Sequence, residues 1–175
     1  SASIAQVHEA ILNDGTTVMV KVRRPGIEET VRADIDLLRS LADLGEKYIP
    51  EARVIRPRLL VEEFARSIRK ELDFVSEAAY TSRFYEEFLN DERVLTPRVY
   101  WDLTSPAVLT LKRLDGVKIT DTEKLQEMRI DKKKLAADLT SVFMKQYFEI
   151  GVFHGDPHPG NILVAKDGKI CLIDF

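Results

Sequence analysis

The chain has 175 residues, 45% of them hydrophobic and 31% charged, which is the composition of an ordinary globular protein. With 26 basic and 29 acidic residues the net charge is −3, so the chain has no basic field for nucleic acid, and we expect no nucleic-acid partner. It contains neither a run of about 18–20 apolar residues, which a membrane span needs, nor a signal peptide. The chain starts without methionine and stops directly after a predicted strand, so we expect a piece of a longer protein, with any targeting signal outside it.

The first predicted element is a β-hairpin. Residues 4–12 and 17–22 are β-like runs separated by Asn-Asp-Gly at 13–15, a strong turn signal. In the second run, valines alternate with Met19 and Lys21, so Lys21 projects from the face opposite the valines. Most strand lysines face solvent, but the position of Lys21 favours a phosphate-binding lysine on a Val-x-Val-Lys-like strand.

A segment of small residues, Ser1-Ala2-Ser3, precedes this hairpin. Small side chains let the backbone approach phosphate groups closely, as glycine loops do. Because alanine lacks the easy access of glycine to positive φ, such a loop predicts altered nucleotide affinity or selectivity.

Two helices are predicted next. Arg-Arg-Pro-Gly at 23–26 breaks the strand pattern, and apolar residues at helical spacing predict a helix over residues 27–48 that Pro50 ends. Pro57 opens the second helix at a favoured first-turn position, and Leu60 and Phe64 begin its apolar stripe. We assign no chemistry to the first of these helices.

Three acids in seven positions, Glu71, Asp73 and Glu77, follow the second helix. On one unbroken helix Glu71 and Glu77 would face different partners, about 120° apart. A break near Asp73 would instead let this residue N-cap a new helix that runs to about Phe88. A kinase needs one helix carboxylate to hold the strand lysine, and we name Glu77 ahead of Glu71 for that role. On pattern alone, a cap is the better interpretation of Asp73.

The middle of the chain predicts a second hairpin and a hinge. Strands are expected over residues 98–101 and 107–114, after Thr-Pro and Ser-Pro pairs. The backbone near Leu114, Asp115 and Gly116 would form a hinge that an adenine could hydrogen-bond. A helix over residues 131–150 follows, with one face turned toward a core.

The last stretch carries the strongest chemical signal. Asp156, Asn161 and Asp174 have the spacing of a kinase catalytic centre, in which the first Asp orients the substrate hydroxyl and the other two residues hold magnesium. Two short strands around an Asp-Gly turn at 167–168 bring Asn161 and Asp174 to the open end of a hairpin, and their hard oxygen ligands suit Mg²⁺. We expect His154 to fix this loop by hydrogen bonding, and the lone Cys171 to be a buried thiol.

These elements predict an α+β, protein-kinase-like fold with two lobes. The N-terminal lobe, residues 1–114, is β-rich with inserted helices. Residues 115–117 form the hinge, and residues 118–175 begin a helical C-terminal lobe that contains the catalytic loop. We treat residues 1–175 as one domain, and expect ATP and Mg²⁺ as its cofactors.

Four ordered stretches resemble the UbiB/aarF-domain atypical kinase family, and the resemblance spans the whole chain. They are Ala-Ser-Ile-Ala-Gln-Val-His at 2–8, Val-Lys-Val-x-x-Pro-Gly at 20–26, Glu-x-Asp-Phe-x-x-Glu-Ala at 71–78 and the catalytic stretch that begins at residue 153. In that family an alanine-rich loop replaces the glycine-rich loop. Relatives often carry Gly at the position of Ala5, which is a small-for-small difference.

The resemblance implies roles for individual residues. Nucleotide binding falls to Ala2, Ser3, Ile4, Ala5, Lys21, Leu114 and Asp115, catalysis to Asp156, Lys21 and Glu77, and the metal to Asn161 and Asp174. Glu71 and Asp73 match the Glu-x-Asp motif of the family and would be regulatory. That Glu is expected to meet a Lys and a Gln of a helical N-terminal extension folded over the active site.

The resemblance further implies an ATP- and Mg²⁺-dependent kinase or ATPase in ubiquinone or other isoprenoid-quinone and prenyl-lipid metabolism. Expected partners are nucleotide, prenyl-lipid or quinone precursors and quinone-biosynthesis proteins. The expected location is the inner-membrane face of a bacterial cytoplasm, or a mitochondrial or plastid interior, with the full-length protein associated with the membrane. Two alternatives stay open: a small-molecule kinase of the aminoglycoside or choline type, which shares His-Gly-Asp-x-x-x-x-Asn, and a nucleotide-gated lipid-binding module without phosphotransfer.

Overall fold

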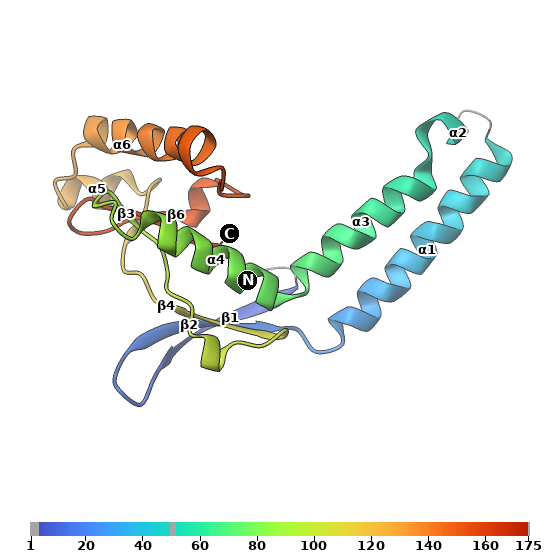
Figure 1. Ribbon diagram of the computed structural model, residues 1–175, viewed down its shortest axis with the longest axis horizontal. Coiled ribbons are helices and arrows are strands. Elements are labelled where there is room, and N and C mark those ends of the chain that lie inside the picture. Colours follow the sequence, from blue (N-terminus) through green and yellow to red (C-terminus); the bar gives the residue numbers. More distant parts are fainter. Residues whose placement is uncertain (1–3, 50–51, 175) are drawn as a thin grey trace.

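The computed structural model describes residues 4–49 and 52–174. Two sheets form its body: a three-stranded sheet in the order β1-β2-β4 and a four-stranded sheet in the order β3-β7-β6-β5. Figure 1 shows helix α4 running between the first sheet and helix α6, while a pair of long helices projects away from the body. The mixed α+β, kinase-like architecture predicted from the sequence is confirmed.

The first sheet contains the predicted hairpin. Strands β1 (Ala5–Ile11) and β2 (Thr17–Arg23) pair antiparallel, and Gly15 has the positive φ of 85° that the turn requires. Strand β4 (Val108–Lys112) pairs with the other edge of β2, so Lys21 lies opposite Val7 on one side and Leu109 on the other. This central position in the sheet holds the Lys21 backbone on both edges.

The predicted long helices form a projecting hairpin. Helix α1 (Ile27–Tyr48) has the predicted bounds, and a short helix α2 (Ala52–Ile55) precedes α3 (Pro57–Glu71), which packs back along α1 (Figure 1). Much of the apolar stripe of each helix faces outward, since Leu41 is 55% and Phe64 49% exposed. In the described part of the chain, no helix is both long and apolar enough to cross a bilayer.

Helix α4 (Phe74–Phe88) begins where the sequence predicted a break. The Asp73 carboxylate accepts hydrogen bonds from the Val75 N–H (3.1 Å) and the Ser76 hydroxyl (3.1 Å), so Asp73 caps the helix. At its start, Phe74 and Ala78 are buried beneath the first sheet with Ala5, Val99 and Leu109. At its other end the helix enters the core of the second lobe, so it belongs to both.

The strand predicted over residues 98–101 is wrong. Only an isolated bridge between Val99 and Leu111 forms there, and a 3₁₀ turn, η1 (Trp101–Leu103), follows at once. Pro97 lacks a backbone N–H and the 3₁₀ turn redirects the chain, so the pairing is too short to make a strand. The short strand in this region is β3 (Val94–Leu95), which pairs in parallel with β7.

The second lobe surrounds the predicted hairpin of β6 (Ile162–Val164) and β7 (Ile170–Leu172). Its other elements are β5 (Val117–Lys118), α5 (Thr122–Glu127), α6 (Lys132–Lys145), the π-helical turn η2 (Gln146–Ile150) and the 3₁₀ turn η3 (Pro159–Asn161). Asp131 caps α6, and Gly151 ends the helical stretch at a φ of 67°. Cys171 is buried in β7, and burial raises the pKa of its thiol to about 11.

The core of this lobe also receives residues from the N-terminal side of the predicted boundary at 114. Phe84, Phe88 and Val94 pack with side chains of α5, α6, β6 and β7, namely Leu125, Leu135, Val142, Ile162, Val164, Ile170 and Leu172. The loop before β3 is tied to α6, because Asp91 accepts from Arg93 (2.7 Å) and Lys145 (3.1 Å). The core of the second lobe is therefore built from residues on both sides of the predicted boundary.

Candidate active site

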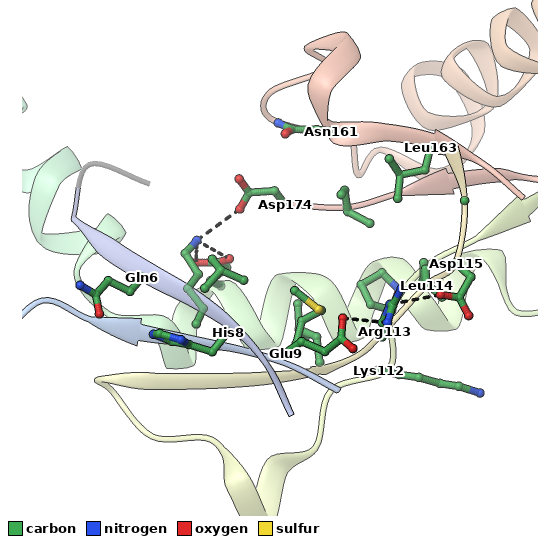
Figure 2. A pocket seen from close by; sticks show the side chains of 18 of the residues that line it. Gln6, His8, Glu9, Lys112, Arg113, Leu114, Asp115, Asn161, Leu163 and Asp174 are labelled. Carbon is green, nitrogen blue, oxygen red and sulfur yellow. Dashed lines mark hydrogen bonds and ion pairs between the residues drawn. The ribbon is translucent and has the colours of Figure 1, made fainter. Parts of the chain in front are cut away.

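A cavity of about 920 Å³ lies between the two sheets. Its described lining comes mainly from β1, β2, helix α4, the end of β4 with the segment after it, and the β6–β7 hairpin. These residues are Gln6, Val7, His8, Glu9, Met19, Lys21, Arg24, Glu77, Pro97, Leu111, Lys112, Arg113, Leu114, Asp115, Gly116, Asn161, Leu163, Ile173 and Asp174. Figure 2 shows Asn161 and Asp174 on one wall, with Gln6 and His8 on the opposite strand. Both lobes thus contribute polar groups to one space.

Lys21 is the centre of the charge arrangement in this cavity. Its ammonium lies 2.9 Å from both carboxylate oxygens of Glu77 and 3.2 Å from Oδ1 of Asp174. It also lies 5.3 Å from the centre of the Phe74 ring, a cation–π distance. Three elements far apart in the sequence, β2, α4 and the end of β7, therefore meet at one cation.

Burial and charge act against each other at this ion pair. Burial disfavours the charged form of Lys21, but the carboxylates of Glu77 and Asp174 outweigh it, so the pKa of Lys21 is raised. Burial raises the pKa of Glu77, and the adjacent Lys21 opposes that effect. Since each charge depends on the other for compensation, removing either one leaves a buried charge without its partner.

Asp174 has an unusual backbone for a non-glycine residue. Its φ is 60°, in the left-handed region, where such residues are uncommon and cluster at functional sites. The preceding residue is held in place, because the Ile173 N–H donates to the Asn161 carbonyl (3.0 Å). This conformation presents the Asp174 carboxylate to Lys21, and the side chain stays more than half exposed to the cavity.

The catalytic loop is shaped by Asn161 and Asp156. The Asn161 amide donates to the backbone carbonyl and to Oδ2 of Asp156, both at 3.2 Å. Asp156 is exposed and lies outside the described residues that line the cavity, next to Asn161, which does line it. The loop thus places the Asp156 carboxylate at the rim rather than in the interior.

His154 holds the loop in place through hydrogen bonds of its ring and its backbone. Its Nδ1 accepts from the Asp156 N–H (3.2 Å), so in the neutral ring Nε2 carries the proton and donates to the Ile173 carbonyl (3.2 Å). Its own N–H donates to Oε1 of the buried Gln146 (2.9 Å). Burial lowers the pKa of His154 and keeps the ring neutral, as both hydrogen bonds require. One side chain therefore connects the backbone of Asp156 to that of Ile173, the residue before Asp174.

The hinge passes unusually close to β6. A β-carbon built on Gly116 would lie 2.9 Å from the Val164 carbonyl oxygen, so only glycine fits without a shift of backbone. Leu114 and Asp115, the predicted hinge residues, both line the cavity, and Figure 2 shows them near Leu163 at the end away from Gln6. A planar base binds between apolar side chains, such as those of Leu114 and Leu163, next to backbone groups that can hydrogen-bond its edge.

The other predicted site residues fall in different places. Ala2 and Ser3 lie outside the described residues. Ile4 and Ala5 are not among the described lining residues, and the Ala5 side chain is buried in the first lobe. Glu71 is exposed at the end of α3, and Asp73 is the cap of α4.

Several lining residues were not anticipated from the sequence. Strand alternation was a signal that could have identified Met19, because this residue lies two positions before Lys21 on the same face of β2. Arg24 follows the end of β2, and the sequence pattern treated it only as a strand breaker. No local signal distinguishes Arg24 from the neighbouring Arg23, whose side chain instead bonds the Leu72 carbonyl.

The donor groups fit a magnesium nucleotide. Asn161 and Asp174 offer an amide oxygen and a carboxylate, which are hard oxygen ligands. Among the described residues no group of three or more His, Cys, Asp or Glu side chains lies close enough to form a metal site by itself. In nucleotide sites Mg²⁺ is commonly held by one or two protein ligands plus phosphate oxygens, and Asn161 and Asp174 would supply two such ligands.

In protein kinases a strand lysine pairs with a helix carboxylate at the wall of a cavity that lies between two lobes. Lys21 and Glu77 have the same arrangement here. The fold and this site define a kinase-like protein.

Comparison with known proteins narrows the class. The model of the ABC1 atypical kinase-like domain matches residues 1–175, and the chain belongs to this family. It is 42% identical over 165 residues to a "Probable protein kinase UbiB" of Pseudomonas aeruginosa, covering 94% of this chain and 31% of that protein. A protein of the same name from Marinobacter nauticus is 39% identical over 179 residues, covering 100% of this chain and 33% of its own length.

A solved structure is also similar. It is described as the complex of Rv3197 with erythromycin from Mycobacterium tuberculosis, and it matches with a TM-score of 0.81 and 30% identity. The match covers all of this chain and 43% of that one. The chain thus spans about a third of the length of the curated relatives that it matches, and under half of the solved structure.

Proposed function

We propose that the protein binds Mg-ATP in the cavity between its lobes and acts as an ATP-dependent phosphotransferase or ATPase. The observation that carries this proposal is the Lys21–Glu77 ion pair, with both carboxylate oxygens 2.9 Å from the ammonium and Asp174 at 3.2 Å. A buried cation fixed in this way is already oriented toward phosphate oxygens before they arrive. The family to which the chain belongs is kinase-like, which supports the proposal.

Each residue of the site has a role in this proposal. Lys21 would contact the nucleotide phosphates, with Glu77 holding it in position. Asn161 and Asp174 would hold Mg²⁺, whose charge offsets that of the phosphates when the nucleotide is bound. Asp156, at the cavity rim, would orient the hydroxyl or water that receives the phosphoryl group. The backbone of Leu114 and Asp115 would hydrogen-bond the adenine.

The biological setting is proposed by likeness. The curated relatives are named UbiB, so we place this protein in ubiquinone or other isoprenoid-quinone and prenyl-lipid metabolism. Its partners would be prenyl-lipid or quinone precursors and the proteins that process them. The location would be the inner-membrane face of a bacterial cytoplasm, or the interior of a mitochondrion or plastid, with the full-length protein associated with the membrane.

Each of the two alternative functions differs from the first proposal in its own way. A small-molecule kinase of the aminoglycoside or choline type shares the catalytic loop, but the ABC1 family match over residues 1–175 favours the first proposal. A nucleotide-gated lipid-binding module would use the same cavity and differ only in lacking turnover.

Glu71, exposed at the end of α3, and Asp73, the cap of α4, are proposed as regulatory because they lie next to the helix that carries Glu77.

The experiment uses the full-length protein and calorimetric titration with Mg-ATP, followed by a phosphate-release assay with and without prenyl-lipid. Lys21→Ala and Asp174→Asn should each weaken Mg-ATP binding by about tenfold or more, since each removes a charged contact. Lys124→Ala, at an exposed lysine of α5, is the matched control and should bind as the unaltered protein does. Unchanged affinity in both site variants would refute the assignment, and binding without phosphate release would favour the gated module.

A further inference from the structure

Arg24 is held at the end of the cavity that lies farthest from the hinge. Its N–H donates to the Ile4 carbonyl (3.0 Å), and its carbonyl accepts from the Ile27 N–H (3.3 Å). The following Pro25 restricts the backbone of Arg24 to extended conformations. The chain then turns through Gly26, whose φ is 73°, into α1. The backbone of Arg24 is therefore fixed on both sides, and its side chain lines the cavity.

In the described part of the chain, a buried side-chain nitrogen without a partner sets Arg24 apart from the other basic lining residues. Lys21 is paired with Glu77 and Asp174, and Arg113 is paired with Glu9 (2.7 Å) and Asp115 (3.1 Å). Within residues 4–49 and 52–174, Arg24 forms no ion pair, and its Nε is buried there without a hydrogen-bond partner. Leaving a buried guanidinium N–H unsatisfied costs free energy, so such a group calls for a missing acceptor.

Strand β2 gives the cavity a direction. At one end of the strand the Arg113 N–H, just before the hinge, donates to the Thr17 carbonyl (3.2 Å). At the other end lies Arg24, whose N–H donates to the Ile4 carbonyl (3.0 Å). Lys21 lies between them, three residues from Arg24, which is roughly 10 Å along an extended chain. A nucleotide with its base at the hinge and its first phosphates at Lys21 extends its last phosphate toward Arg24.

We propose that Arg24 is a second phosphate-binding residue, which contacts the end of the polyphosphate chain farthest from the base. The acceptor that its buried Nε lacks is then a phosphate oxygen, and the planar guanidinium can bind two such oxygens side by side. The cavity consequently prefers triphosphates to diphosphates and monophosphates. This inference rests on the proposed function, because it takes a nucleotide as the occupant of the cavity.

The test is a series of ligands that differ only in phosphate number. Adenosine, AMP, ADP and ATP, each with Mg²⁺, are titrated into the full-length protein and into Arg24→Gln, which keeps a polar side chain but shortens it and removes the charged guanidinium. We expect roughly tenfold to hundredfold weaker ATP binding, a smaller loss for ADP, and unchanged binding of AMP and adenosine. The control is Lys112→Gln, also in the lining but directed away from Asp174 in Figure 2, which should show no dependence on phosphate number.

The outcomes separate this inference from the proposed function. If the unaltered protein binds none of the four ligands, the proposed function fails and the inference falls with it. If the unaltered protein binds ATP and Arg24→Gln loses affinity equally for all four ligands, or for none, only the role of Arg24 is overturned. The thermal midpoint without ligand shows whether Arg24→Gln is folded. Should it not fold, Arg24→Lys replaces it and must weaken ATP binding at least threefold relative to AMP, or the inference is overturned.

Discussion

The body of the molecule and the α1–α3 hairpin are both built from amphipathic helices, but they place the apolar face differently. In the body, Phe84 of α4 and Val142 of α6 are fully buried in a core shared by several elements. In the hairpin, Leu41 and Leu44 of α1 and Phe64 of α3 are exposed, and the contact between the two helices buries Ile35 and Ala65. An apolar stripe therefore predicts a helix, but not the surface that will cover it.

Ion pairs differ between the two regions in the same way. Lys21–Glu77 and Lys145–Asp91 join segments more than 50 residues apart and are largely shielded from water. Arg39–Glu62 and Arg58–Asp43 in the hairpin join neighbouring helices, and their acidic partners are more open to solvent. Shielded pairs fix geometry and are costly to break, whereas exposed pairs are worth about 0–1 kcal/mol. The body is thus built for positioning, and four predictions follow that contrast.

The largest expected effect is on turnover and is confined to the body. Asp156→Asn keeps the size of the side chain but removes the carboxylate that would orient the acceptor. Phosphate release or transfer by the full-length protein should fall by about 10²–10⁴-fold, with Mg-ATP affinity within about twofold of the unaltered value. Steady-state assay and calorimetry on the same preparation measure the two quantities. Turnover at the unaltered rate would remove Asp156 from the mechanism.

The next effect is on stability, and compares one aromatic residue from each region. Phe84→Ala in the core of the body should lower the free energy of unfolding by about 3–5 kcal/mol, because it leaves a cavity among buried side chains. Phe64→Ala on the exposed face of α3 should cost roughly 0.5 kcal/mol or less. Urea unfolding followed by circular dichroism measures both. Equal losses would mean that the hairpin face is buried in the full-length protein.

Ion pairs should show a smaller version of the same contrast. Asp91 is 6% exposed and accepts from Arg93 and Lys145, which hold its pKa well below the usual range. Asp91→Ala should cost roughly 1.5–3 kcal/mol, because it leaves two cations without their acceptor. Glu62→Ala, which breaks the solvent-screened pair with Arg39, should shift the unfolding midpoint much less than Asp91→Ala does. If both variants unfold at the same urea concentration, the distinction between the two kinds of pair is wrong.

The smallest effect is a pH dependence that originates in the body. Because burial lowers the pKa of His154 in the folded state, the unfolded chain binds the proton more readily. The contribution of His154 to stability should therefore be complete above about pH 6.5 and be lost as the pH drops below that value. His154→Gln should flatten the unfolding free energy between pH 5 and 7. A variant with the same slope as the unaltered protein would show that other groups cause the dependence.

The sequence predicted most local elements, because their signals are local. The β1–β2 hairpin, the bounds of α1, the cap at Asp73 and the β6–β7 hairpin all depend on turn residues, spacing and capping chemistry. The strand over residues 98–101 failed because a proline and a 3₁₀ turn shortened the pairing. Burial of α4 residues in the second lobe is a long-range property, which periodicity does not contain.

The residues of the candidate site also divide into those with a local sequence signal and those that only the folded structure identifies. Pattern and spacing brought Lys21, Asn161 and Asp174 to attention, and the structure places them around one cavity. Glu77 was named ahead of Glu71, and it is Glu77 that meets Lys21. Arg24 was passed over because its significance depends on which partners its side chain lacks, and this is visible only once the neighbouring strand and helix are in place.

Helix α4 carries two contacts one turn apart: Glu77, which meets Lys21, and Tyr80, whose hydroxyl donates to the Phe153 carbonyl at the start of the catalytic loop (2.5 Å). A rigid helix moves both side chains together. An outward shift of α4 by the length of a hydrogen bond would therefore release Lys21 from Glu77 and loosen the loop that begins at Phe153 in a single event. The helix would act as a latch, so that assembly of the site is close to all-or-none.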